Sequence, residues 1–324
     1  MQRRSRQLIR AWLLVGAAAV CLQGCGSSSG SGSGSPNASS ATSTGAKAHA
    51  PGAGKPPVVL GTKNFTEEIV LGQLYAQALR AKGYKVTLRP NIGASEVMQG
   101  ELAARAIDGY PEYTGTILSV LAHDPRRPPT AAVAYARAAS YARQHNDVLL
   151  AMAAATDTDV LIAKPQFASA HHLRSLTDLR QVGSPLTVAA APEFRTRFNG
   201  MVGLRQVYGV TTLRLLPVKI GDQYRALDDG RSQLAAVFTT DGQLTQGGYT
   251  LLTDPQNIFG FQNVTFVVRR DVLDREGPAF ARTINSVSAN LSTQALRVMN
   301  AAVVLDGQNP AAVAHQFLAA NGLT

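Results

Sequence analysis

The sequence is poor in cysteine, tryptophan and charged residues. Its two cysteines, Cys21 and Cys25, and its one tryptophan, Trp12, all lie near the N-terminus of the 324-residue chain. The rest of the chain can therefore form no disulfide and no thiolate metal site. Charged residues make up 16 % of the chain, below the roughly 25 % that is usual in soluble domains, so the surface must rely on uncharged polar residues.

Motifs of several enzyme classes are also missing. No G-x-G-x-x-G or P-loop motif stands at a predicted strand–helix junction, which argues against nucleotide binding. The chain after residue 57 lacks the G-x-S-x-G motif and a visible nucleophile–base pair. His171 and His172 are adjacent, so they cannot converge on one metal ion from a helix or strand, and we expect them in an exposed loop. We therefore expect a protein that is not an enzyme and has no metal or cofactor.

The positive net charge does not indicate nucleic-acid binding. The formal charge is +10, but four arginines lie among residues 1–10 with no acid beside them. Without these four, 27 basic residues stand against 21 acidic ones, a balance of +6. The remainder has no basic run and no interleaving of basic and aromatic residues, so we expect no nucleic-acid partner.

The N-terminus has the layout of a secretory signal. Residues 1–10 are basic, residues 11–21 are apolar, and Leu22-Gln23-Gly24-Cys25 follows. The apolar stretch is shorter than the roughly 20 residues that span a bilayer. Leu-x-Gly-Cys resembles the lipobox of bacterial lipoproteins, which predicts a signal peptide at 1–24 and lipidation of Cys25. The alternative is a plain secreted protein with an incidental cysteine.

The segment 25–57 is predicted to be a flexible tether. It consists mainly of Gly, Ser, Ala, Thr and Pro, with hardly any large apolar residue. Such a segment cannot bury enough surface to offset the entropy lost on ordering. We therefore expect the folded part to lie on the extracytoplasmic face of the cell membrane, held there by its lipid anchor only.

The remainder alternates predicted strands and helices. Asn64 and Glu67 have the spacing of a capping box, which predicts a helix from there to a stop at Gly83. The strands are expected at 57–61, 84–88, 106–110, 186–190, 213–217, 235–238, 249–253 and 263–269. Further helices are expected from residue 95 and at 200–208, 278–291, 295–304 and 311–320. This alternation predicts parallel sheets with helices on both faces.

The strand–helix series occurs twice, which predicts two α/β lobes. Lobe 1 is expected to comprise 58–160 and 262–324, and lobe 2 to comprise 161–261. Ligands bind at the carboxyl ends of strands in open α/β sheets, so we expect a cleft between the lobes. The alternative is a pair of independent lobes without a shared cleft.

Five short segments carry a resemblance to a known family. They are GTKNFTE at 61–67, YPEYTGT at 110–116, PEFRTRFNG at 192–200, QYRAL at 223–227 and FTTDG at 238–242. In order and spacing they resemble the osmoprotectant-binding proteins of ABC importers, which take up glycine betaine, carnitine and choline. The resemblance implies a two-lobed, type II periplasmic-binding-protein-like fold. It also implies a monomer that delivers a small osmolyte to permease subunits with a cytoplasmic ATPase.

The resemblance also implies a set of ligand-binding residues. A betaine has a quaternary ammonium, which aromatic faces attract, and a carboxylate, which cationic groups and N–H donors bind. By resemblance, Tyr113, Tyr224 and Phe238 would form an aromatic cage. The side chains expected at the polar end are those of Lys63, Thr116 and Arg197.

Asp159 departs from the family pattern. It stands where the family usually has a tyrosine of the cage. An inward carboxylate would favour a ligand with net positive charge over a zwitterion, whereas a solvated Asp159 would have no such effect. A different, non-betaine ligand therefore remains an alternative. An envelope enzyme, or a scaffold protein with a vestigial cleft, is a further one.

Overall fold

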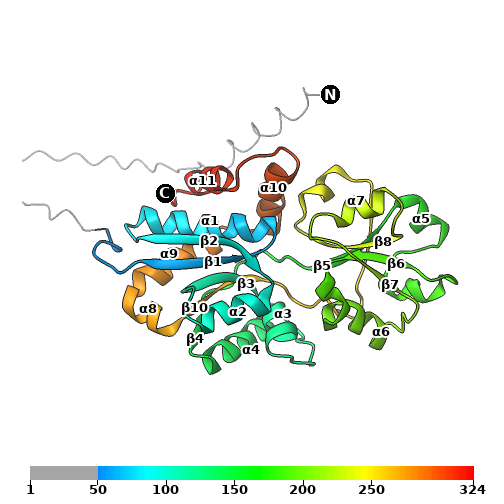
Figure 1. Ribbon diagram of the computed structural model, residues 1–324, viewed down its shortest axis with the longest axis horizontal. Helices are drawn as coiled ribbons and strands as arrows, with labels where there is room; N and C mark the ends of the chain where they lie inside the picture. The colour runs from blue at the N-terminus through cyan, green and yellow to red at the C-terminus, as the bar shows by residue number, and fades with distance from the viewer. Residues whose placement is uncertain (1–49) are drawn as a thin grey trace, which may run out of the picture. The chain divides into compact units, whose positions relative to one another are not determined.

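A computed structural model describes residues 50–324, which form two five-stranded sheets with helices on both faces (Figure 1). We call the sheet β2-β1-β3-β10-β4 and its helices lobe 1, and the sheet β7-β6-β8-β5-β9 and its helices lobe 2. The predicted signal peptide, Cys25 and residues 25–49 of the predicted tether lie outside the described residues.

Lobe 1 is built around a mixed sheet. Its strands are β1 (Val58–Lys63), β2 (Val86–Gly93), β3 (Gly109–Tyr113), β4 (Asp147–Leu149) and β10 (Val264–Arg269). Its helices are α1 (Thr66–Ala81), α2 (Ser95–Ala103), α3 (Thr114–Thr116), α4 (Ala131–Gln144), α8 (Arg270–Glu276), α9 (Pro278–Ala289), α10 (Thr293–Val304) and α11 (Pro310–Ala320), with a π-helical turn η2 (Ile117–Leu121). β1 runs parallel to β2 and β3, whereas β10 runs antiparallel to β3 and β4.

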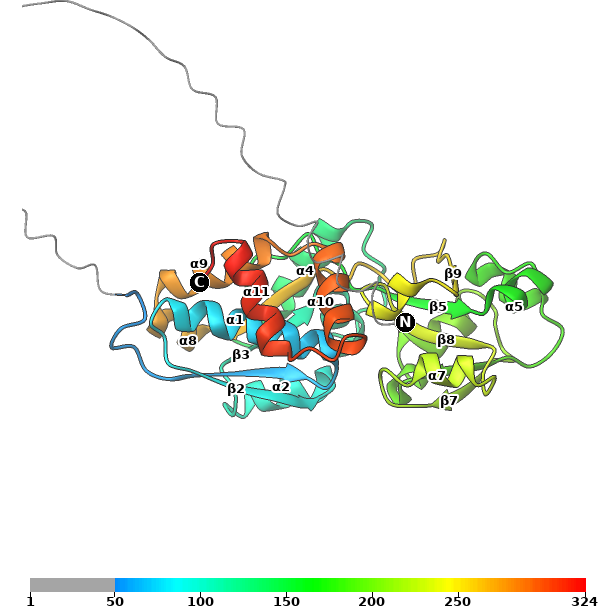
Figure 2. The ribbon, with the colours of Figure 1, turned by 90° about the horizontal axis from the view of Figure 1, so that it is seen from above.

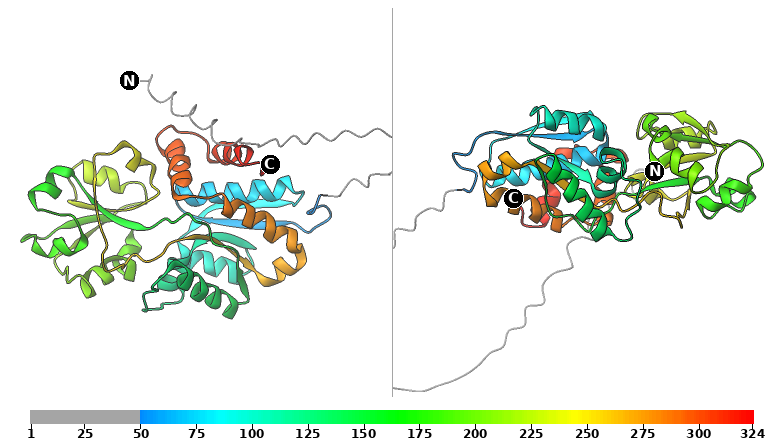
Figure 3. Two further views of the ribbon diagram at one scale, coloured as in Figure 1. Left: turned by 180° about the vertical axis from the view of Figure 1, so that it is seen from behind. Right: turned by 90° about the horizontal axis from the view of Figure 1, so that it is seen from below.

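The two faces of the lobe 1 sheet have separate cores. Val58 and Leu60 pack with α1, α9, α10 and α11, while Val59 between them packs on the face covered by α2 and α4. This alternation follows from the two-residue repeat of a strand. Figure 2 shows α11, which carries the C-terminus, beside α1, and Figure 3 shows α4 on the opposite face.

Lobe 2 repeats the plan with shorter elements. Its strands are β5 (Asp159–Ala163), β6 (Thr187–Ala190), β7 (Arg214–Pro217), β8 (Leu234–Phe238) and β9 (Thr250–Leu252). Its helices are α5 (Pro165–Ala170), α6 (Gly203–Gln206) and α7 (Gln223–Asp228), with short turns η3 (Leu176–Gln181), η4 (Pro192–Arg195), η5 (Phe198–Val202) and η6 (Gly242–Gln246). β6 is parallel to β7 and β8, and β5 is antiparallel to β8 and β9.

The expectation of parallel sheets holds for only part of each sheet, since each also contains an antiparallel strand. β5 and β10 are the strands by which the chain enters each sheet from the other lobe, and both run antiparallel to their neighbours. A strand that arrives this way follows no helical crossover on its own sheet, so the rule that makes βαβ strands parallel does not constrain it. Residues 159 and 160, assigned above to lobe 1, are already part of β5 and thus of lobe 2.

Two local expectations also need correction. The residue before the first turn of α1 is Phe65 rather than Asn64, and no side chain caps this end. With Phe65 at the N-cap, Glu67 is the second helical residue rather than the third, so the predicted capping box does not form. Residues 50–57 are not part of a free tether, since the buried Gly52 donates its N–H to the Lys82 carbonyl over 2.8 Å.

Two crossing segments, 156–158 and 253–263, connect the lobes, and Thr156 and Asn263 pair with each other there. α10 of lobe 1 also reaches this junction (Figures 1 and 2). Arg297 donates to the Thr239 carbonyl over 2.6 Å, and Asn300 donates to the Thr240 carbonyl over 3.0 Å. The loop after β8 is therefore held by lobe 1 as well as by its own sheet.

Within residues 50–324, no helix combines the length and the apolar character that a membrane crossing requires.

Candidate ligand-binding site

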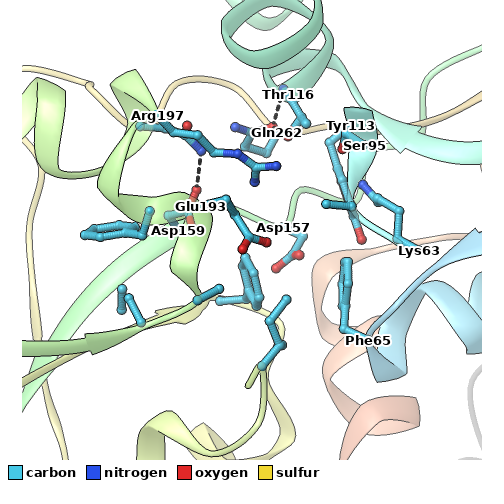
Figure 4. Close-up of a pocket in the computed structure, with 18 of the residues that line it drawn as sticks. Lys63, Phe65, Ser95, Tyr113, Thr116, Asp157, Asp159, Glu193, Arg197 and Gln262 are labelled. Atoms are coloured by element: carbon cyan, nitrogen blue, oxygen red, sulfur yellow. Dashed lines mark hydrogen bonds between the residues drawn. The ribbon is translucent and has the colours of Figure 1, made fainter. Parts of the chain in front are cut away.

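A pocket partly open to solvent lies between the two lobes (Figure 4). The last residues of β1, β3, β6 and β8 all line it, as expected for a site at the carboxyl ends of the strands. We call it the interlobe pocket. Its lining comprises Lys63, Asn64, Phe65, Ala94, Ser95, Tyr113, Thr116, Asp157, Asp159, Ala190, Ala191, Glu193, Phe194, Arg197, Asn199, Ile220, Gln223, Ala236, Phe238 and Gln262.

Three aromatic rings form one wall of the pocket, which we call the aromatic wall: Phe65, Tyr113 and Phe238. The Phe65 ring is stacked on Phe238 with centroids 5.5 Å apart and on Tyr113 with centroids 6.4 Å apart. Phe65 and Tyr113 belong to lobe 1, and Phe238 ends β8 of lobe 2. The aromatic wall therefore contains rings from both lobes and presents ring faces and edges to the interlobe pocket.

Lys63 lies against this wall. Its Nζ is 4.1 Å from the Tyr113 ring centroid, and it contacts the Glu112 carboxylate and lies 3.5 Å from Glu68 Oε1. Lys63, Glu68 and Glu112 are all buried. Burial alone would lower the pKa of Lys63, but the charges of Glu112 and Glu68 outweigh it and raise that pKa. Lys63 is thus an ammonium group held inside the pocket wall by the Glu112 carboxylate, with the Glu68 carboxyl group nearby.

Glu67 and Asp157 tie the wall to the junction of the lobes. Glu67 accepts hydrogen bonds from the Tyr113 hydroxyl over 2.7 Å and from Asn300 Nδ2 over 2.8 Å. Asp157 lies in a crossing segment and accepts a hydrogen bond from the Thr240 hydroxyl. Burial raises the pKa of both carboxyl groups. The bond from the Tyr113 hydroxyl to Glu67 fixes the orientation of the Tyr113 ring.

Asp159 lies in the pocket wall rather than in solvent. Its Oδ2 accepts a hydrogen bond from Asn199 Nδ2 over 2.8 Å, drawn as a dashed line in Figure 4. Burial raises its pKa to about 6, although the Asn199 bond and the charge of Arg197 act in the opposite direction. The position that departs from the family pattern therefore presents a carboxylate to the ligand space.

Arg197 and Thr116 lie on the opposite side of the pocket from Phe65 (Figure 4). Arg197 Nη2 donates to both carboxylate oxygens of Glu96 over 3.0 and 3.3 Å, and its Nε is buried without a hydrogen-bond partner among the described residues. Gln262, from a crossing segment, accepts from the Thr116 N–H over 2.9 Å. The first contact connects Arg197 of lobe 2 to Glu96 of lobe 1, and the second connects Thr116 of lobe 1 to a crossing segment.

Five of the six side chains proposed from the sequence line the interlobe pocket: Lys63, Tyr113, Thr116, Arg197 and Phe238. The sixth, Tyr224, does not. Its hydroxyl donates to Asp241 over 3.0 Å, and its ring packs on Tyr249 with centroids 5.3 Å apart. Asp241 also accepts from the Phe238 N–H, so Tyr224 supports the backbone of a lining residue.

The central ring, Phe65, and the acidic lining residues Asp157 and Glu193 were not predicted from the sequence. Phe65 stands in the GTKNFTE segment directly after β1, so its place at a strand end was a usable signal. Figure 4 shows the Asp157 and Glu193 side chains turned into the pocket. The His171–His172 pair is exposed after α5 as expected, and the described residues hold no group of three or more metal-ligating side chains.

The buried acids predict that stability falls as the pH rises. Burial raises the pKa of Glu68 to about 8, of Asp241 to about 7 and of Asp159 to about 6. Between about pH 5 and about pH 8 the folded chain therefore binds more protons than the unfolded chain, so the free energy of unfolding decreases. Melting temperatures measured across this range at constant ionic strength should decline. A rise would contradict the assignment, and Asp241→Asn should flatten the decline.

Taken together, the geometry defines a class of protein. Two α/β lobes joined by two crossing segments enclose a pocket with an aromatic wall and charged groups, the arrangement of a two-lobed solute receptor. Over residues 56–320 the chain matches the family described as the substrate binding domain of ABC-type glycine betaine transport systems. The chain belongs to this family. It is therefore a substrate-binding receptor of an ABC importer, extracytoplasmic in its place of action, and not an enzyme.

Named relatives support the same conclusion. The chain is 30 % identical over 270 residues to a glycine-betaine-binding protein of Pseudomonas aeruginosa, covering 80 % of this chain and 86 % of that protein. It is 28 % identical over 280 residues to the glycine betaine-binding protein YehZ of Escherichia coli, covering 83 % and 92 %. The solved apo structure of YehZ has a TM-score of 0.61 at 27 % identity, covering 83 % of this chain and 99 % of that one.

Proposed function

We propose that this receptor captures a quaternary-ammonium osmoprotectant of the glycine betaine, carnitine or choline type in the interlobe pocket. The observation that carries the proposal is the aromatic wall. A quaternary ammonium has no N–H to donate, so dispersion and ring faces must hold it, at about 0.5–2 kcal/mol for each cation–π contact. Phe65 and Tyr113 come from lobe 1 and Phe238 from lobe 2, so one cation can contact both lobes.

Contacts with both lobes also provide a signal for the transporter. A ligand that touches both lobes stabilises the closed arrangement relative to the open one. The closed receptor is then the form that delivers the osmolyte to the permease subunits, which a cytoplasmic ATPase drives. The lipobox-like segment that ends at Cys25 supports lipidation of that residue, which would anchor a monomeric receptor to the extracytoplasmic face of the cell membrane.

The test is isothermal titration of the purified protein with glycine betaine, carnitine, choline and proline betaine. We expect saturable micromolar binding of at least one of them, and a decrease in the radius of gyration by small-angle scattering when it binds. A protein that unfolds cooperatively but binds none of the four would refute the proposal. It would favour the alternative that Asp159 has adapted the receptor to another kind of ligand.

A further inference from the structure

Two cationic side chains line the interlobe pocket, and both already contact carboxylates of the protein. Lys63 contacts Glu112 and lies 3.5 Å from Glu68. Arg197 pairs with Glu96. A ligand with its own carboxylate would therefore share its positive partner with protein carboxylates, and at Arg197 it would find the buried Nε, which has no partner among the described residues. This observation bears on which quaternary-ammonium compounds the receptor accepts.

Arg197 lines the pocket, and its partner Glu96 lies directly after the lining residue Ser95. Glu96 is in the first turn of α2 in lobe 1, and Arg197 precedes η5 in lobe 2, so the pair bridges the lobes. The side chains are 19 % exposed for Arg197 and 52 % exposed for Glu96. Both oxygens of Glu96 contact Arg197 Nη2, at 3.0 and 3.3 Å. A guanidinium–carboxylate contact of this kind is the one that the acid group of a zwitterionic ligand would make.

The other titratable lining residues are acidic: Asp157, Asp159 and Glu193. Burial raises the pKa of Asp157 well above its usual value, so the negative charge comes from Asp159 and Glu193. Burial raises the pKa of Asp159 to about 6, although the nearby charge of Arg197 acts in the opposite direction. This value is below neutral pH, so Asp159 is mostly ionised at about pH 7. A second anion placed beside these groups is repelled, whereas a cation is attracted.

From this arrangement we propose that Glu96 takes, on Arg197, the place of a ligand carboxylate, so that the pocket selects a quaternary ammonium alcohol over a quaternary ammonium acid. The inference rests on the proposed function and names the substrate class within it. The cationic head of such a ligand contacts the aromatic wall. Its hydroxyl donates to an acidic lining residue, a contact that a carboxylate cannot make.

The test is a titration of the full chain and two variants with choline and with glycine betaine. For the unaltered chain we expect choline to bind at least about tenfold more tightly than glycine betaine. Glu96→Gln removes the charge but keeps the side-chain shape and frees Arg197. It should raise the affinity for glycine betaine about tenfold and leave the affinity for choline within about threefold, a difference of about 1.4 kcal/mol between the two ligands.

The matched control is Glu101→Gln. Glu101 lies on the same helix and also pairs with an arginine, Arg89 at 3.1 Å, but both belong to lobe 1 and neither lines the pocket. It should leave both affinities unchanged. Glycine betaine binding as tightly as choline to the unaltered chain, or an unchanged ratio in Glu96→Gln, would overturn the inference and leave the proposed function intact. Absence of binding by both ligands to all three proteins would overturn the inference, and the proposed function would fall with it only if carnitine and proline betaine also failed to bind.

Discussion

Replacing Lys63 by methionine is expected to lower the free energy of unfolding by about 3–5 kcal/mol. Methionine fills a similar volume but leaves Glu112 and Glu68 buried without their positive partner. One oxygen of Glu112 already lacks a hydrogen-bond partner among the described residues, so little else is available to satisfy this carboxylate. Urea unfolding at about pH 7 measures the change.

The pH dependence of this loss separates a charge effect from a packing effect. At about pH 5 the carboxyl groups left without Lys63 take up protons more readily. Lys63→Met should therefore lower the free energy of unfolding by less at about pH 5 than at about pH 8. Lys164→Met is the matched control. Lys164 also has a carboxylate partner, Asp228 at 2.6 Å, and an aromatic neighbour, Tyr249, but the ion pair is exposed. Lys164→Met should lower the free energy of unfolding by less than about 1 kcal/mol. Equal decreases for Lys63→Met and Lys164→Met would contradict the prediction.

Replacing Phe65 by alanine is expected to weaken binding of a quaternary-ammonium ligand by about tenfold or more, or about 1.4 kcal/mol. Phe65 is stacked on both Tyr113 and Phe238, so its loss removes one ring face and also leaves the other two without their shared support. Titration with whichever of choline and glycine betaine binds more tightly gives the change in the dissociation constant.

Phe167→Ala is the control for Phe65→Ala. Phe167 is also partly buried and lies against another aromatic side chain, His171, but it is on α5 and does not line the interlobe pocket. Its removal should leave ligand affinity unchanged. If Phe65→Ala binds the ligand as tightly as Phe167→Ala does, then the aromatic wall does not hold the cation.

Much of the fold could be predicted because local apolar patterns determine it. The predicted strand at 213–217 and the predicted helix at 311–320 lie within one residue of β7 (Arg214–Pro217) and α11 (Pro310–Ala320). Strand direction could not be read in this way. An apolar run such as Val264–Arg269 has the same pattern in either direction, and only its entry from lobe 2 makes β10 antiparallel.

The site was less predictable because its partners are distant in sequence. Lys63 was expected at the polar end of the ligand, but Glu112, 49 residues away, holds its ammonium beside the Tyr113 ring. Arg197 and Glu96 are separated by 101 residues. No spacing rule connects such pairs. The positions of lining residues could be anticipated from strand ends, whereas the charge balance among them required the tertiary structure.

The bonds from α10 to the loop after β8 also determine how the lobes can move. Arg297 and Asn300 attach the Thr239 and Thr240 carbonyls to lobe 1, next to the crossing segments. While these bonds hold, we expect lobe 2 to rotate about an axis that passes close to them. Phe238 is close to this axis, so it would be displaced little on closure. Arg197, across the pocket, is further from the axis and would be displaced more. Closure would then move the charged side of the pocket further than the aromatic wall.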